Sequence, residues 1–224
     1  MVTLALVYTP PFNSVADSAA IRAMVAEYRT AWLVTVGPDG IPTATLLPIF
    51  WHEDTVIAHQ AKANAQWRTI AEDAPGLLIC SGPEAYVSPS WYAAKAEHGK
   101  VVPTWNYSAV HLTGTVRVHH DPVWLRRAVT ELTGIHEAGR PHPWQVSDAP
   151  EAYIAAQLNG IVGIEFTVTS VEGKAKLSQN RSAADQAGVI AGLREAGELD
   201  PHQAAGAHAV ADAMAELGTA APPA

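Results

Sequence analysis

The sequence predicts a mainly β protein in which a closed antiparallel barrel carries short helices at its edges. Six or seven short segments have the apolar patterns of strands, and tight turns join several of them into hairpins. Strands do not alternate regularly with long helices, and neither a GxGxxG nor a Walker A sequence occurs, so a doubly wound nucleotide-binding sheet is not expected. The 224 residues, 48% of them hydrophobic, are enough for one substantial core.

The first part of the chain is predicted to be a helix followed by an antiparallel meander. Ser14 and Asp17 precede apolar residues at helical spacing, which is typical of a capped amphipathic helix. The turns GPDG and HED separate apolar segments, and Asn64 is a candidate N-cap. The elements expected here are a helix over 14–29, strands over 31–36, 41–51 and 55–60, a helix over 64–73 and a strand over 76–82.

The second part is predicted to begin with an irregular, aromatic-rich loop over 81–107. Pro122 suits the first turn of a helix. The elements expected after the loop are a strand over 110–120, a helix over 121–137, a proline-rich link over 139–150, a strand over 160–173 and a helix over 180–197. We therefore expect one domain over 1–197 and an Ala-rich tail over 198–224, formed by a terminal helix that frays.

Composition excludes several classes of function. The formal net charge is −8, and the 14 basic residues are scattered among 22 acidic ones, so binding to nucleic acid is not expected. No apolar run reaches the roughly 18–20 residues of a membrane span, and the first residues carry no secretion signal. The single cysteine, Cys80, lies in the apolar stretch GLLICSG and is expected to be a buried small hydrophobe. A cytoplasmic protein is predicted.

Four blocks in order make the chain similar to a known family: HQAKANAQWR (59–68), SGPEAYVSPSWY (81–92), VPTWNYSAVHLTG (102–114) and GIVGIEF…EGKAKLSQNR (160–181). Together they resemble the FMN-binding negative transcriptional regulators, or PaiB-like proteins, over nearly the whole chain up to about residue 197. The resemblance implies a split β-barrel of the flavin-reductase and pyridoxamine-phosphate-oxidase type. It also implies a homodimer with the cofactor at the subunit interface. Some split barrels bind FMN and others bind haem, and one branch of the family comprises the haem-dependent piperazate synthases.

His59 is the first candidate site residue, because it opens the most polar block of the barrel. Neutral imidazole is a common axial ligand of haem iron, so His59 is a candidate ligand of haem b. With FMN the same side chain would only hydrogen-bond the flavin or its phosphate. A structural or surface role is also open. His119 and His120 are expected at the surface.

The residues that follow His59 are expected to bind an anionic group at the start of a helix. These candidates for cofactor binding are Lys62, Asn64, Gln66 and Arg68. FMN carries a phosphate and haem carries propionates, so the patch does not choose between the two cofactors. A solvated helix cap is the simpler alternative. Leu46 stands where the family pattern has a histidine, which makes the expected cofactor face more apolar and favours a porphyrin.

Two further blocks supply the remaining candidates. Trp105 and Tyr107 belong to an aromatic segment of the kind that lines cofactor rims, and packing at the barrel mouth is the alternative. Gln179 and Arg181 are placed near the cofactor by the resemblance, although this block could also be a plain helix start.

Two functions are weighed. The favoured hypothesis is a haem-dependent lyase that closes Nδ-hydroxy-L-ornithine into L-piperazic acid by net dehydration, in natural-product (antibiotic) biosynthesis. Lys62 or Tyr107 would relay a proton, and Arg68 or Arg181 would bind the carboxylate of this small amino-acid substrate. The alternative is an FMN-binding PaiB-like protein that acts as a transcriptional regulator or a small-molecule reductase.

Overall fold

The computed structural model describes residues 8–219, which fold into two compact units formed by alternating parts of the chain. Unit 1 contains the described residues 8–16, 81–109 and 172–219, and unit 2 contains 17–80 and 110–171. Three long strands have segments in both units: β5 (Ala74–Val87), β6 (Thr104–His119) and β7 (Ile161–Lys176). Each unit is described by itself.

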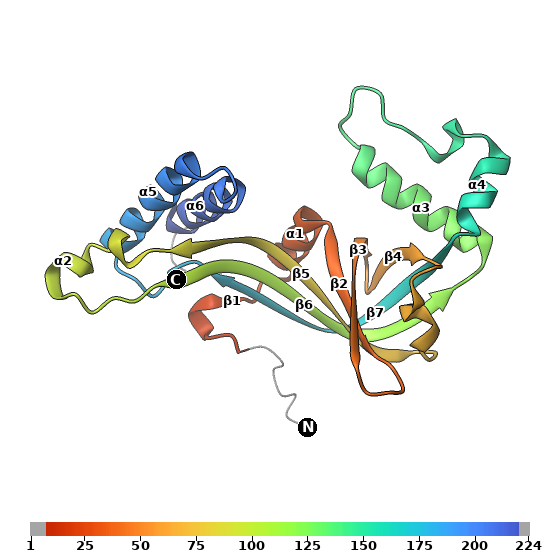
Figure 1. Ribbon diagram of the computed structural model, residues 1–224, viewed down its shortest axis with the longest axis horizontal. Coiled ribbons are helices and arrows are strands. Elements are labelled where there is room, and N and C mark those ends of the chain that lie inside the picture. Colours follow the sequence, from red (N-terminus) through yellow and green to blue (C-terminus); the bar gives the residue numbers. More distant parts are fainter. Residues whose placement is uncertain (1–7, 220–224) are drawn as a thin grey trace. The chain divides into compact units, whose positions relative to one another are not determined.

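The remaining elements belong to one unit each (Figure 1). Unit 2 contains α1 (Ser18–Tyr28), β2 (Thr30–Val36), β3 (Pro42–His52), β4 (Thr55–Ala61), the 3₁₀ helix η2 (Ala65–Thr69), α3 (Pro122–Glu137), η4 (Val146–Asp148) and α4 (Glu151–Leu158). Unit 1 contains η1 (Pro11–Asn13), β1 (Ser14–Val15), η3 (Pro89–Trp91), α2 (Ala94–His98), α5 (Ala183–Leu199) and α6 (Ala204–Thr219).

The strands form one sheet that closes on itself, as the sequence predicts. Their order is β1-β7-β4-β3-β2-β5-β6, and an additional pairing of β6 with β7 completes the barrel. β2 pairs antiparallel with β3 and β5, and β4 pairs antiparallel with β3 and β7. At Gly114 in β6 an added Cβ would lie 2.0 Å from the carbonyl oxygen of Thr167 in β7. Only glycine therefore allows the two strands to approach so closely at this point.

Alternating residues of the strands fill the core of unit 2. In β4, Val56, Ala58 and Gln60 are buried, whereas the residues between them are only half-buried. This two-residue period directs every second side chain to the same face of the strand. Cys80 is fully buried, and burial raises the pKa of its thiol to about 12. The prediction that Cys80 is a small buried hydrophobe is thereby confirmed.

Several predicted boundaries are wrong in an informative way. The first helix begins at Ser18, because the side chain of Asp17 caps it, while Ser14 belongs to β1. The expected loop over 81–107 has strand at both of its ends, because β5 continues to Val87 and β6 begins at Thr104, and the short helices η3 and α2 lie between them. Gly82 and Pro83 suggest a loop in the sequence. The strand nevertheless continues past them with Ala85 and Val87 turned into a core.

Unit 1 has its own core, in which α5 and α6 pack against each other (Figure 1). Val189 and Leu193 of α5 and Val210 and Met214 of α6 are buried in it. The predicted terminal helix is therefore present as α6, and residues 220–224, at the end of the chain where fraying is predicted, lie outside the described residues. Ser182 caps α5, which therefore begins three residues after the predicted start at 180. Among residues 8–219, no helix is long and apolar enough to cross a membrane.

Candidate functional site

His59 lies on the outward-facing side of β4, opposite the barrel core. It pairs with Gly163 of β7, and opposed residues of an antiparallel pair point to the same face. An added Cβ at Gly163 would lie 2.0 Å from a ring carbon of Trp124, so the indole of α3 lies on the face that carries His59. Burial lowers the pKa of His59. No other described residue hydrogen-bonds its ring, so His59 presents a neutral imidazole with its nitrogens available.

The segment after His59 is held firmly against the barrel by side-chain amides. Asn64 caps η2 by accepting a hydrogen bond from the backbone nitrogen of Gln66 (3.0 Å), and its Nδ2 donates to Thr45 Oγ1 (2.9 Å). Gln66 is buried, and its Nε2 lies 3.0 Å from the Leu33 carbonyl and 3.0 Å from Thr35 Oγ1. The side-chain amides of Asn64 and Gln66, which are predicted to bind the cofactor, thus fix this segment against the neighbouring strands β2 and β3.

The helix in this segment is shorter than predicted, which changes the expected anion site. η2 is a 3₁₀ helix of five residues, and Asn64 already accepts from the N–H of Gln66. The number of free N–H groups is therefore smaller than a full helix would offer. The cations remain. Lys62 and Arg68 are exposed and form no ion pair with any described residue, and Arg68 lies 5.3 Å from the ring centre of Trp67.

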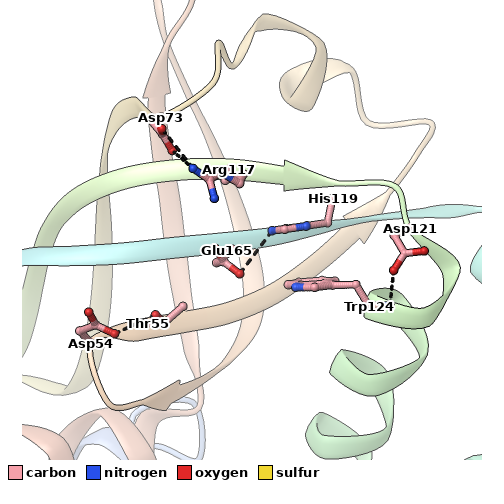
Figure 2. A network of polar contacts seen from close by, with 8 residues as sticks. All are labelled: Asp54, Thr55, Asp73, Arg117, His119, Asp121, Trp124 and Glu165. Carbon is pink, nitrogen blue, oxygen red and sulfur yellow. Dashed lines mark hydrogen bonds and ion pairs between the residues drawn. The ribbon is translucent and has the colours of Figure 1, made fainter.

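Polar and ring contacts join the start of α3 to the strands β6 and β7 (Figure 2). The ring of His119 stacks on Trp124, with centroids 4.2 Å apart and planes 5° from parallel. His119 Nε2 lies 3.3 Å from Glu165 Oε2, an ion-pair distance outside hydrogen-bond geometry. Burial lowers the pKa of His119, against the opposing effect of Glu165. The sequence interpretation of His119 as a surface residue is wrong, because α3 folds back over it, whereas His120 is exposed as predicted.

The other predicted site residues lie in unit 1. Trp105 is exposed and packs edge-to-face on Tyr86, with centroids 6.1 Å apart. Gln179 is engaged with its own turn: its Oε1 accepts from Leu177 N (2.8 Å), and its Nε2 donates to Ala175 O. Neither side chain lines the cavity that contains the remaining two candidates, Tyr107 and Arg181.

That cavity has a volume of about 390 Å³ and lies at the ends of β6 and β7. Tyr107 and Arg181 share it with Lys176, which belongs to the block that the resemblance places near the cofactor, and with Lys174, which the sequence interpretation did not single out. The signal was present in the stretch GKAKLSQNR, because lysines two residues apart on a strand point to the same face. The predicted residues therefore form two groups, His59 to Arg68 in unit 2 and Tyr107 with Arg181 in unit 1.

The family model described as "Putative FMN-binding domain" matches residues 7–170 of the chain. The chain belongs to this family. A curated member, the protease synthase and sporulation protein PAI 2 of Bacillus subtilis, is 32% identical over 191 residues, which are 84% of this chain and 89% of that protein. The PaiB-like resemblance predicted from the four sequence blocks is thus confirmed at the level of the family.

Other relatives of this FMN-binding-domain protein agree with the assignment. An uncharacterised protein of Aspergillus fumigatus is 36% identical over 160 residues, covering 64% of this chain; the chain spans 60% of that protein's length. Among solved structures, the FAD and haem binding protein of Mycobacterium smegmatis has a TM-score of 0.57 at 15% identity and covers 78% of each chain. This structural likeness establishes the split-barrel fold that the sequence predicts.

Proposed function

We propose that the chain is a haem-dependent cyclase that converts Nδ-hydroxy-L-ornithine to L-piperazic acid. In this redox-neutral dehydration the α-amine nitrogen forms a bond to Nδ, the Nδ–O bond breaks, and the hydroxyl group leaves as water with a proton from the amine. The observation that carries the proposal is the neutral, unpartnered imidazole of His59. A protein of the same fold is described as binding both FAD and haem, which supports testing either group here.

We assign haem binding to three residues of unit 2. His59 would bind the iron through an imidazole nitrogen, because the neutral ring has a lone pair available. Lys62 and Arg68 would pair with the propionates, since both cations are exposed and lack an ion pair among residues 8–219. Bound haem would supply a metal centre that acts as a Lewis acid or redox partner on the N–O bond. We assign the role of proton relay to Lys62 or Tyr107. We assign the binding of the substrate carboxylate to Arg68 or Arg181.

The cofactor is tested by the visible spectrum of the purified protein after addition of haem. We expect a sharp Soret band that is lost in His59→Ala and retained in His52→Ala, a matched change of an exposed histidine at the end of the neighbouring strand. A protein that takes up flavin and no haem would overturn the haem assignment.

The reaction is tested separately with the haem-loaded protein and Nδ-hydroxy-L-ornithine. Mass spectrometry should detect a product smaller by one water, and His59→Ala should reduce its rate of formation by at least tenfold. Uptake of haem without this product would retain the cofactor and reject the cyclase.

A second candidate, an FMN-binding protein that regulates transcription or reduces a small molecule, is favoured by the family description. In this case Lys62 and Arg68 would bind the phosphate of FMN. Titration with FMN, followed by the quenching of flavin fluorescence, tests it. Saturable binding that Arg68→Gln weakens, in a protein that takes up no haem, would select this candidate.

We also propose that the protein is a homodimer. The outer face of β2 and β3 exposes a cross-strand pair, Trp32 (43% exposed) and Leu46 (49% exposed), and Val36 is exposed on the same strand as Trp32. Contiguous apolar side chains of this size are typical of interaction surfaces. A second copy of the chain is the partner that the family resemblance implies.

A further inference from the structure

The cavity of unit 1 has the size and polarity of a small-molecule site. Its volume of about 390 Å³ lies within the range of roughly 300–1,000 Å³ found for ligand pockets. The ends of β6 and β7 form its walls through Tyr107, Lys174 and Lys176, and the turn that follows β7 contributes Ser178 and Arg181. All of these residues belong to unit 1.

The cavity concentrates positive charge in an acidic protein. Lys174, Lys176 and Arg181 line it, and its lining includes no Asp or Glu. None of the three cations forms an ion pair with a described residue, although the chain as a whole carries a net charge of −8. Three neighbouring cations without a counter-charge repel one another, so this arrangement favours the binding of an anion.

The contacts of these cations are with neutral groups. Lys176 Nζ donates to Thr104 Oγ1 and to the carbonyl of Trp105, and Lys174 Nζ lies 5.1 Å from the ring centre of Tyr107. Burial lowers the pKa of Lys176; Tyr107 opposes this effect, and the charges of Lys174 and Arg181 add to it. A bound anion would relieve this repulsion and restore the pKa of the lysine.

The turn that presents Arg181 is fixed by buried hydrogen bonds. Ser178 has a left-handed backbone, with φ of 63°, a conformation that costs energy for a residue other than glycine. The fully buried Asn106 donates from Nδ2 to Ser178 Oγ (3.0 Å), and Gln186 Nε2 donates to the carbonyls of Ser178 (3.2 Å) and Arg181 (3.0 Å). The guanidinium of Arg181 lies 4.6 Å from the ring centre of Tyr92, whose buried hydroxyl has no partner among residues 8–219.

We propose that this cavity binds the oxyanion of a small organic acid, a carboxylate or a phosphate monoester, through Lys174, Lys176 and Arg181. The site would hold the anionic end of the ligand against the two lysines, and the Tyr107 and Tyr92 rings would flank it. The cavity shares Tyr107 and Arg181 with the proposed cyclase, in which they are candidates for the proton relay and the carboxylate partner, but anion binding here requires neither haem nor the segment from His59 to Arg68.

The test is calorimetric titration of the full-length protein at low ionic strength with two probes, sodium phosphate and sodium acetate. Lys176→Gln and Arg181→Gln should each weaken binding by about tenfold or more, the effect expected when a charge-assisted hydrogen bond is lost. Lys176→Arg should retain most of the affinity, because it keeps the charge. The matched control is Lys95→Gln in the same unit, whose ammonium donates to Ser90 Oγ and does not line the cavity.

The two probes separate the possible ligands. Binding of acetate alone assigns the site to carboxylates, binding of phosphate alone assigns it to phosphate esters, and binding of both assigns it to small oxyanions of either class. Absence of binding of either probe at millimolar concentration, or equal affinity in the wild type and in a folded Arg181→Gln variant, would overturn the proposal. His59→Ala should leave the affinity for either anion unchanged, so a failure of haem uptake and a failure of anion binding are read independently.

Discussion

At the scale of single residues, the absence of a side chain at Gly163 decides how α3 packs on the barrel. The indole of Trp124 occupies the space where a Cβ would stand, and it stacks in turn on His119. Glycine here is a packing requirement, since its φ is not in the left-handed region. The packing of α3 on the barrel and the stack of Trp124 on His119 therefore both require that position 163 has no side chain.

We predict that Gly163→Ala destabilises the protein by about 1–3 kcal/mol, the usual cost of forcing an extra carbon into a packed interior. Chemical denaturation measures the free energy of unfolding. The control is Gly134→Ala in α3, where an added Cβ meets nothing within 4 Å. It should be neutral or stabilising by up to about 1 kcal/mol because alanine favours the helix. Equal effects of the two substitutions would contradict the packing argument.

His119 gives the stability a dependence on pH whose sign follows from its environment. Its pKa is lowered from 6.5 in the folded state, chiefly by burial. Above pH 6.5 both states are mostly neutral at this residue, so it contributes little. As the pH falls below 6.5 the unfolded state binds the proton first, and the free energy of unfolding decreases.

His119→Gln should therefore reduce the loss of stability between about pH 7.5 and about pH 5.5, as measured by urea unfolding at both values. His120→Gln replaces the neighbouring exposed histidine and is the matched control. An unaltered pH dependence in His119→Gln would contradict burial as the cause of the lowered pKa.

At the scale of elements, the spacing of apolar residues predicts the bounds of strands and helices correctly wherever the pattern is uninterrupted. β2, β3, β4 and α3 lie within two residues of their predicted ranges. The long strands β5 and β6 were cut short because Gly82, Pro83 and a run of aromatics interrupt the pattern, and only tertiary pairing carries the strands through. Both α5 and the terminal helix α6 are predicted from the sequence, but their packing against each other is not, because contact across a turn leaves no local signal.

The packing of α5 on α6 predicts which leucines of α5 matter. Leu193 is 1% exposed in the core of unit 1, whereas Leu199 is 78% exposed at the end of the same helix. Leu193→Ala should cost about 2–5 kcal/mol, the range for a buried leucine, and Leu199→Ala should change stability by less than about 0.5 kcal/mol. Both are measured by thermal or urea unfolding. A tolerated Leu193→Ala would contradict the buried interface between the two helices.

At the scale of the whole molecule, the sequence identified the fold and family but only part of the candidate sites. His59 and the cations after it could be predicted because they form one contiguous block. The cavity of unit 1 could not, because Tyr107 and Lys176 lie 69 residues apart in numbering and are brought together only by adjacent strand ends. Asn64, Gln66 and Gln179 are predicted as cofactor contacts from their places near helix starts and from the family resemblance, and in the structure their amides hold neighbouring backbone and side-chain groups.

The proposed homodimer is the prediction that concerns the molecule as a whole. Leu46→Glu places a charge opposite Trp32 on the exposed face of β2 and β3, and burying an unpaired charge in an interface is costly. Light scattering coupled to size exclusion should therefore detect a dimer for the wild type and a monomer for Leu46→Glu. Val123→Glu changes a more exposed apolar residue on α3 and should remain dimeric. A wild-type monomer, or a dimer that is insensitive to Leu46→Glu, would mean that this face serves some purpose other than self-association.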